Sequence, residues 1–338
     1  MFKLSSSNNN NKTEKSIYAE VTDIILQSLK EGNIPWQRPF AKTGLPANFT
    51  TKEQYKGINV LLLNNAILKN NYESKYFLGF VQVQSLQGMV NKGEKAHPVV
   101  YFTVKEKEIT AEEKDEIIEK RPEANIVEHS EKEGMYIYTY PVLKRHFVFN
   151  VCQTNLKDKI INEEINEVKI SNLKDDDKIQ RIENFLNSIE NKPKIINTAI
   201  GRACYIPSTD TIQIPKKSLF VGIDEYYSTL FHELVHSTLH DSRLNRKAEG
   251  LDFGSQEYAK EELIAELGSA FLCWQFGIQK VIQNQAAYIK SWIQILENDK
   301  KILLQASKAA QKAVEYLNEA GRQIKKEDTN KKIYVKRR

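Results

Sequence analysis

The chain has 338 residues, of which 41% are hydrophobic and 28% are charged, with a formal net charge of +5. This length predicts two domains, and this composition is that of an ordinary soluble protein. No run approaches 18 consecutive apolar residues, which excludes a membrane span, and three cysteines without a C-x-x-C pair argue against a disulfide framework or a thiolate zinc site.

The chain begins with a run of serines and asparagines and has no apolar core of a signal peptide there. We expect residues 1–16 to form a disordered leader, and we expect the protein to act in the cytoplasm. Apolar residues then recur at helical spacing from Ile17 to Leu29, and Gly32 follows as a stop. This pattern predicts an amphipathic helix that opens the first domain.

Aromatic and cationic residues alternate in the loop after this helix, from residue 34 to 59. Single-stranded nucleic acid is bound by rings that stack on its bases and cations that neutralise its phosphates. The candidates for such contacts are Trp36, Arg38, Tyr55 and Lys56. An equally good interpretation is that Trp36, Phe40 and Tyr55 close a small core.

The rest of the first domain mixes helix and strand patterns and is expected to end at residue 156. Periodicity predicts a helix over residues 60–68 and strands over 77–83, 99–104, 135–140 and 146–151. Residues 105–133 contain eleven acids and six Lys or Arg, which predicts a solvated acidic insertion. Residues 157–172 are charged and rich in asparagine, as in a linker.

The second domain is expected over residues 173–321, with a basic tail over 322–338. Most of it has helical periodicity, and the stretch from 286 to 317 is expected to be helical. Residues 205–215 predict two short strands whose prolines suit only a sheet edge, and such an edge can pair with an extended peptide. The expected fold is α+β, with a mixed α/β first domain and a mostly helical second domain that carries a small edge-stranded sheet.

The residues with the clearest chemistry are His232, Glu233 and His236, which form a His-Glu-x-x-His motif within a helical pattern. Positions i and i+4 lie on one face of a helix, so both imidazoles can bind one ion, and Glu233 lies about 100° around the helix beside them. This arrangement predicts a Zn²⁺ site in which Glu233 acts as the general base. A catalytic zinc ion needs a third protein ligand and keeps one position open.

Four downstream residues are candidates for the third ligand: Glu261, Glu262, Glu266 and His240. On an unbroken helix His240 stands about 12 Å along the axis from His232, too far to share one ion. Glu262 and Glu266 share a helical face, and metal-bound histidines are usually oriented by a second carboxylate. We therefore expect Glu262 to be the ligand and Glu266 to orient a ligating histidine.

The ordered motifs resemble those of ArdC-type antirestriction proteins, which plasmids and other mobile elements carry. In the first half the resemblance depends on short motifs at residues 34–36, 45–48, 55–59, 92–94 and 148–153. In the second half it depends on residues 205–207, 210–212, 232–236, 243–246, 253–255 and 258–268. The chain departs from the family pattern between His236 and His240, where the aromatic residue and the glycine are absent.

The resemblance implies a first domain that binds single-stranded DNA and a zincin-like metallopeptidase second domain. It implies a protein that shields mobile DNA from host restriction, with a host protein as a peptidase substrate. His240 and Tyr258 are candidate donors to the oxyanion of peptide hydrolysis. The alternative is a single-stranded-DNA-binding protein whose zinc domain is a non-catalytic scaffold, so the chain is an enzyme only in the first interpretation.

Overall fold

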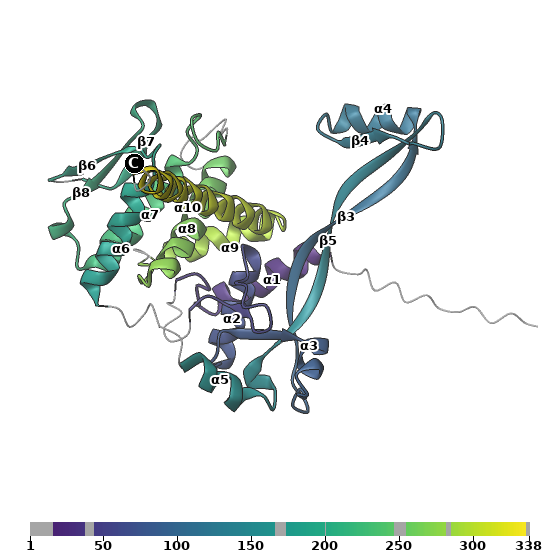
Figure 1. Ribbon diagram of the computed structural model, residues 1–338, viewed down its shortest axis with the longest axis horizontal. Helices are drawn as coiled ribbons and strands as arrows, with labels where there is room; N and C mark the ends of the chain where they lie inside the picture. The colour runs from purple at the N-terminus through teal and green to yellow at the C-terminus, as the bar shows by residue number, and fades with distance from the viewer. Residues whose placement is uncertain are drawn as a thin grey trace, which may run out of the picture.

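The computed structural model describes residues 16–37, 44–165, 174–199, 201–246, 255–281 and 285–335 (Figure 1). Of the positions predicted to contact DNA, Arg38 lies outside these residues, as does almost all of the expected leader. The described parts of the chain form two β-sheets with helices around them, which confirms the α+β prediction.

The N-terminal half is a sheet with helices packed beside it. Its helices are α1 (Ile17–Lys30), α2 (Ile58–Asn70), α3 (Phe80–Ser85), α4 (Ala111–Lys120) and α5 (Lys157–Ile165), and its strands are β1 (Ala47–Asn48), β2 (Tyr76–Gly79), β3 (His97–Thr110), β4 (Asn125–Glu128) and β5 (Met135–Asn150). The strand order is β1-β2-β5-β3, with β4 paired to β5. Among the described strands of this sheet, only β1 and β2 pair in parallel.

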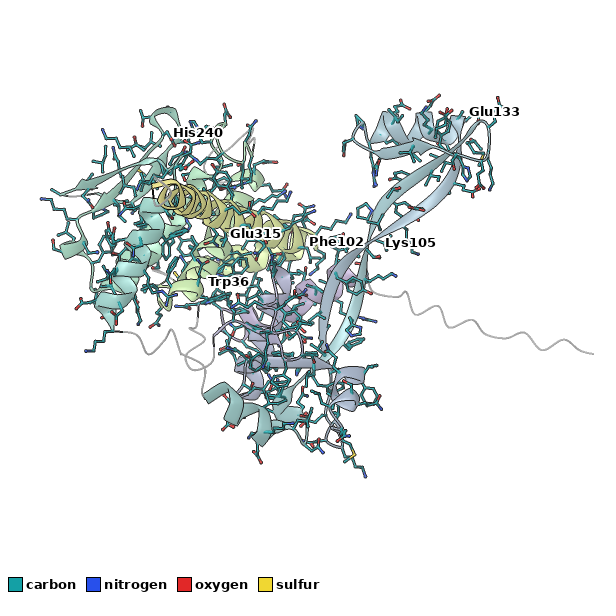
Figure 2. All side chains as sticks on the ribbon, in the orientation of Figure 1. Trp36, Phe102, Lys105, Glu133, His240 and Glu315 are labelled. Carbon is teal, nitrogen blue, oxygen red and sulfur yellow. The ribbon has the colours of Figure 1, made fainter. Side chains whose placement is uncertain are left out.

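Strands β3 and β5 form one long hairpin that projects from the body of the protein (Figure 1). Pairing runs without a break from His97 opposite Val148 to Thr110 opposite Met135. The predicted strands 135–140 and 146–151 are therefore parts of a single strand. The expected acidic insertion was also only partly right: its first residues continue β3, and α4 and β4 then form the tip, where Figure 2 shows Glu133.

Two further predictions for this half differ from the structure. The strand expected to reach Val83 ends at Gly79, because the Gln82 side chain accepts a hydrogen bond from the Gly79 N–H at 2.8 Å and begins α3. Residues 157–165, expected to begin a linker, are helical in α5, and Ile160 is buried against the N-terminal sheet region.

The C-terminal half packs helices against a small three-stranded sheet. Its helices are α6 (Asp175–Ser188), α7 (Ile223–Ser237), α8 (Gln256–Phe276), α9 (Gln285–Asn298) and α10 (Ile302–Val335), and its strands are β6 (Lys194–Thr198), β7 (Cys204–Ile206) and β8 (Thr211–Pro215). The sheet order is β6-β8-β7, so of the two strands expected at a sheet edge β7 does lie at an edge, whereas β8 lies between the other two strands. The stretch expected to be helical over 286–317 consists of α9 and the first part of α10, and α10 continues into the expected basic tail.

One cluster of buried apolar side chains joins the two halves. It includes Val21 and Ile25 of α1 together with Leu296 of α9 and Ala310 of α10. Trp36 belongs to it, is 0% exposed, and packs edge-on against Trp292 with ring centroids 5.0 Å apart. Helices α1 and α9 are thus held together by burial of apolar surface, the main favourable term in folding.

Helices α7 and α8 approach closely at Gly268. A Cβ built on Gly268 would lie 2.9 Å from both Cγ atoms of Val235, one residue before His236. Any larger residue here would push the two helices apart, because a valine side chain has little freedom to move aside. None of the helices in the described ranges is long and apolar enough to cross a bilayer.

We expect Gly268→Ala to lower the free energy of unfolding by roughly 1–3 kcal/mol, as overpacking of a tight core does. Thermal unfolding measures this. Gly222→Ala is the matched control, because a Cβ on Gly222 has no atom within 4 Å. Adding Val235→Ala to Gly268→Ala should restore part of the loss, and a purely additive double variant would argue against the contact.

Candidate metal centre

Helix α7 presents its two motif histidines side by side. Its apolar residues, including Leu230, Phe231 and Leu234, are buried in the core. This orients His232 and His236 toward α8, with their Nε2 atoms 3.0 Å apart. The i, i+4 spacing therefore brings the two nitrogens together as the sequence predicted.

Helix α8 brings Glu262 to the same point. Its Oε2 lies 3.5 Å from His232 Nε2, and its Oε1 lies 3.5 Å from His236 Nε2. These three residues form the group in the described part of the chain whose donor atoms all lie within 4.8 Å of one another. Ligands at about 2.0–2.2 Å in a tetrahedron stand about 3.3–3.6 Å apart. The two separations between Glu262 and the histidines fall in this range and the separation of the two Nε2 atoms is shorter, so the three residues lie close enough together to hold one divalent ion.

Each histidine also has a carboxylate on its other ring nitrogen. His232 Nδ1 lies 3.6 Å from Glu266, and His236 Nδ1 lies 3.2 Å from Glu261. Such partners fix the ring orientation and point the Nε2 lone pair at a shared ion. The place of Glu266 is the one expected from the sequence, whereas Glu261 was considered only as a ligand. The sequence did contain a signal for this role of Glu261, because Glu261 is adjacent to Glu262 on α8 and therefore faces a neighbouring part of α7.

Both carboxylates are in turn held by a cation, which is buried for Lys280 and partly buried for Arg246. Lys280 Nζ lies 3.1 Å from Glu266, and Arg246 Nη2 donates to Glu261 at 2.9 Å. Arg246 also donates to the Thr238 hydroxyl and to the Val235 carbonyl oxygen. Neither cation is marked out by a sequence motif that predicts this role. They complete two parallel chains of contacts, each running from a cation through a carboxylate to a histidine.

The charges of this region leave room for a dication. Among the described residues, the four carboxylates of Glu233, Glu261, Glu262 and Glu266 exceed the two cations that pair with members of this group, Arg246 and Lys280, by two charges when both histidines are neutral. Burial lowers the pKa of His236, but its bonds to Glu261 and Glu262 outweigh burial and raise it to about 10. The same histidines lower the pKa of Glu262, against the effect of burial. The region is built to hold positive charge.

Glu233 lies on a different side of α7 and is 8% exposed. Its charge contributes to raised pKa values of Cys204 in β7, Tyr258 in α8 and Tyr288 in α9, although burial is the larger cause in each. Burial and Glu262 together raise the pKa of Tyr258 to about 12. The base predicted from the motif is therefore within electrostatic range of the edge strand and of two phenol groups.

His240 is not part of this group. Helix α7 ends at Ser237 and Thr238 caps it, so the expectation that His240 continues the helical ladder was wrong. Its Nδ1 instead lies 2.8 Å from the Ser242 hydroxyl. Of the two candidate oxyanion donors, Tyr258 is the one that interacts with Glu262.

The residues predicted to contact DNA do not form one surface. The prediction for Trp36 was wrong, because a buried ring cannot stack on a base. Tyr55 is partly buried and packs edge-on against Phe77, with ring centroids 6.4 Å apart. Lys56 is exposed, and its Nζ lies 2.7 Å from Glu315 of α10. The interpretation of Trp36 and Tyr55 as core residues is the one that the structure supports.

Two known families match separate parts of the chain. Residues 15–149 match the N-terminal domain of the anti-restriction factor ArdC, and residues 180–309 match a zincin-like metallopeptidase family. The metal-free crystal structure of the antirestriction ArdC protein from the R388 plasmid is 30% identical, with a TM-score of 0.70, over 91% of this chain and 99% of that one. Its Mn(II)-bound structure is 29% identical, with a TM-score of 0.67, over 91% and 98%.

Curated proteins give two kinds of match. A DNA primase TraC of Escherichia coli is 31% identical over 91% of this chain, and a second is 30% identical over 90%. The chain spans only 20% and 27% of the length of those primases. An uncharacterized protein, y4eC of Sinorhizobium fredii (strain NBRC 101917 / NGR234), is 27% identical over 91% of this chain and 93% of its own length.

Titration with a divalent metal should separate the three acids of α8. We expect Glu262→Ala to abolish tight binding, because it removes a donor atom. Glu261→Ala and Glu266→Ala should each weaken binding by about 10–100-fold, as loss of a carboxylate that orients a metal-bound histidine typically does. Isothermal titration calorimetry measures the affinities. Tight binding by Glu262→Ala, or loss of binding by Glu266→Ala alone, would show that the ligand has been misassigned.

Proposed function

This chain belongs to the ArdC family of antirestriction proteins, and we propose from that membership that it protects the DNA of a mobile element from host restriction. We propose that it does so in the cytoplasm, by binding single-stranded DNA, and that it carries a zinc metallopeptidase site directed at a host protein. The observation that carries the second part is the donor set of His232, His236 and Glu262 with Glu233 on the same helix.

The proposed metal is Zn²⁺, held by His232, His236 and Glu262. Two imidazoles and one carboxylate form a ligand set that catalytic zinc sites use, and the donor separations fit its bond lengths. The relative from R388 has a Mn(II)-bound structure, which supports a divalent metal at this site. When bound, the ion would polarise a substrate carbonyl and increase the acidity of a water molecule.

The protein's own groups would carry the proton. Glu233 is placed to accept a proton from water and to pass it to the amine that leaves when the peptide bond breaks. Tyr258 is our candidate for the donor to the developing oxyanion, because its phenol interacts with the proposed ligand Glu262 and carries a proton near pH 7. The edge strand β7 offers unpaired backbone groups to an extended substrate.

The DNA-binding part of the proposal draws on the match to the ArdC N-terminal domain. Exposed rings on the hairpin arm replace Trp36 as candidates for base stacking: Tyr101 is 48% exposed, Phe102 51% and Phe147 44%. The guanidinium carbon of Arg145 lies 5.0 Å from the Phe147 ring centroid, so a cation stands beside one of them. Rings beside cations suit a single strand.

A second candidate function is DNA binding with a structural metal. The observation in its favour is that each histidine is already held by a buried carboxylate and cation, an arrangement that would also stabilise a fold. An intact Glu233 beside Tyr258 argues for the peptidase, because a structural zinc site has no need of a base.

We expect Glu233→Ala to retain about one metal ion per chain and to lose peptidase activity, because Glu233 is not one of the donor residues. Metal analysis and cleavage of a fluorogenic peptide library measure the two effects. Glu190→Ala, at an exposed position away from the site, is the control. Loss of metal in Glu233→Ala would contradict the role of base, and full protection of DNA by this variant would favour the structural metal.

We expect the full chain to bind oligothymidylate with an affinity that falls as salt rises. The slope of log affinity against log salt should be about 0.7 per phosphate neutralised. Lys56→Ala should lower that slope, whereas Lys30→Ala, which removes another exposed ion-paired lysine, should not. A salt-independent affinity measured by fluorescence anisotropy would contradict the proposed mode of binding.

A further inference from the structure

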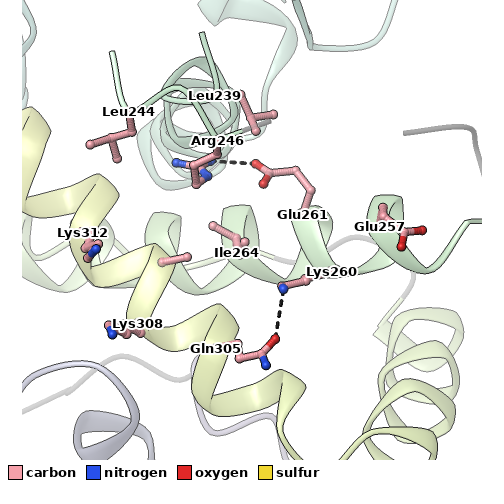
Figure 3. A pocket seen from close by; sticks show the side chains of 11 residues that line it. Leu239, Leu244, Arg246, Glu257, Lys260, Glu261, Ile264, Gln305, Lys308 and Lys312 are labelled. Atoms are coloured by element: carbon pink, nitrogen blue, oxygen red, sulfur yellow. Dashed lines mark hydrogen bonds and ion pairs between the residues drawn. The ribbon is translucent and has the colours of Figure 1, made fainter. Parts of the chain in front are cut away.

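A cavity of about 490 Å³ lies between α8, α10 and the segment after α7 (Figure 3). This volume is within the range of about 300–1,000 Å³ found for small-molecule sites. None of the three metal-donor residues lines the cavity, so it is distinct from the metal centre. It is adjacent to that centre, because Glu261, the partner of His236, forms part of its wall.

The wall of the cavity is rich in cations. Lys308 and Lys312 project from one face of α10, one helical turn apart, and Lys260 stands on α8 and donates to Gln305 at 3.0 Å. Arg246 adds a fourth cation and binds Glu261 (Figure 3). The other acid of the wall, Glu257, is at the opposite end from Lys312 in Figure 3.

The two cavity lysines of α10, Lys308 and Lys312, have no acidic partner among the described residues. Within the residues that the structure describes, neither Lys308 nor Lys312 forms an ion pair. Lys312 lowers the pKa of Glu315 electrostatically, but that carboxylate is bound by Lys56 at 2.7 Å. The cavity therefore presents excess positive charge, which favours an anionic occupant.

The remaining wall is apolar and comes from Leu239, Leu244, Ile264 and Ala309. A ligand that fills the site must therefore combine an anion with an apolar face. A nucleotide does so, since its phosphate can meet the lysines while its sugar and base lie against the aliphatic side chains. Lysine is also a common phosphate ligand, because it acts as a point charge with three donors.

An exposed ring beside the cavity favours a nucleotide over an acidic peptide. Phe102 of the hairpin arm is 51% exposed, and the Lys308 Nζ lies 5.5 Å from its ring centroid. Figure 2 shows Phe102 next to the part of α10 that carries Glu315, the partner of Lys56. A ring next to a row of cations can stack on a base while the cations bind phosphates, whereas an acidic peptide would leave the ring without a role.

We propose that this cavity binds a nucleotide of a DNA single strand, with Lys308 and Lys312 as phosphate ligands and Phe102 as a stacking surface for a neighbouring base. The proposal rests on the DNA binding proposed above and extends it from the N-terminal half to α8 and α10. It places the strand against Arg246, a residue of the cavity wall whose guanidinium binds Glu261. Glu261 also contacts His236, so the bound strand would lie close to the metal centre.

The test compares oligothymidylate binding by the full chain and by two kinds of cavity variant. Lys308→Ala with Lys312→Ala removes the proposed phosphate ligands, and Ala309→Leu fills the cavity without a change of charge. Lys194→Ala with Lys216→Ala is the matched control, because it removes two exposed lysines at the far sheet. Circular dichroism confirms that each variant is folded.

We expect the double lysine variant to lose at least about tenfold in affinity and to lower the salt slope by roughly 1.4, or 0.7 for each of two phosphates. Ala309→Leu should weaken binding with the slope nearly unchanged, and the control should behave as the parent does. Cavity variants that bind as tightly as the control would overturn the cavity assignment and leave DNA binding in place. A parent chain that binds no oligonucleotide would overturn both proposals.

The same variants distinguish an acidic peptide from a nucleotide. Polyglutamate of comparable length should compete with oligothymidylate only weakly, because it offers no ring to Phe102. Phe102→Ala should reduce oligonucleotide affinity and leave polyglutamate binding unchanged. If polyglutamate binds more tightly than the oligonucleotide and depends on Lys308 and Lys312, the cavity is a peptide site and the proposal is wrong.

Discussion

The close approach of α7 and α8 is the contact on which the rest of the site depends. Gly268 leaves no side chain between the helices, so Val235 packs directly against the α8 backbone. At that separation the three acids of α8 reach the two histidines of α7. Glu266 lies beside His232 Nδ1, Glu261 lies beside His236 Nδ1, and Glu262 lies beside the Nε2 atoms of both. A residue without a side chain thus sets the distances on which metal binding depends.

Burial of so many charges in one place needs compensation from outside the donor set. Glu261 and Glu266 are each 6% exposed, and isolated carboxylates at such positions would favour protonation. Arg246 and Lys280 pair with them and compensate their charge, and carboxylates beside the histidines make these better metal ligands. Buried ion pairs add little net stability by themselves, so the arrangement is better explained by the demands of a metal site than by those of folding.

The continuous core gives the two halves a common frame. Trp36 against Trp292, and α1 against α9, tie the N-terminal sheet to the helices that carry the metal centre. Lys56 on one half and Glu315 on the other meet along α10, and Phe102 of the arm reaches Lys308 of the same helix. In the proposed function, helix α10 is therefore where a DNA strand bound by the first half would meet the second half. The distance between the proposed DNA contacts and the candidate metal centre is then short.

The sequence by itself determined the features that depend on local spacing. His232 and His236 share a face because they are four residues apart, and Glu262 and Glu266 share one for the same reason. The alternation of residues 205–215 likewise predicts the two short strands β7 and β8. Only the tertiary structure decided which acid meets which histidine, since that depends on how α7 crosses α8. It also decided that Trp36 is buried, that Arg246 and Lys280 support the site, and that α7 ends before His240. These outcomes depend on contacts between residues distant in sequence. A local sequence pattern does not show which apolar face or which charged side chain a given residue will contact.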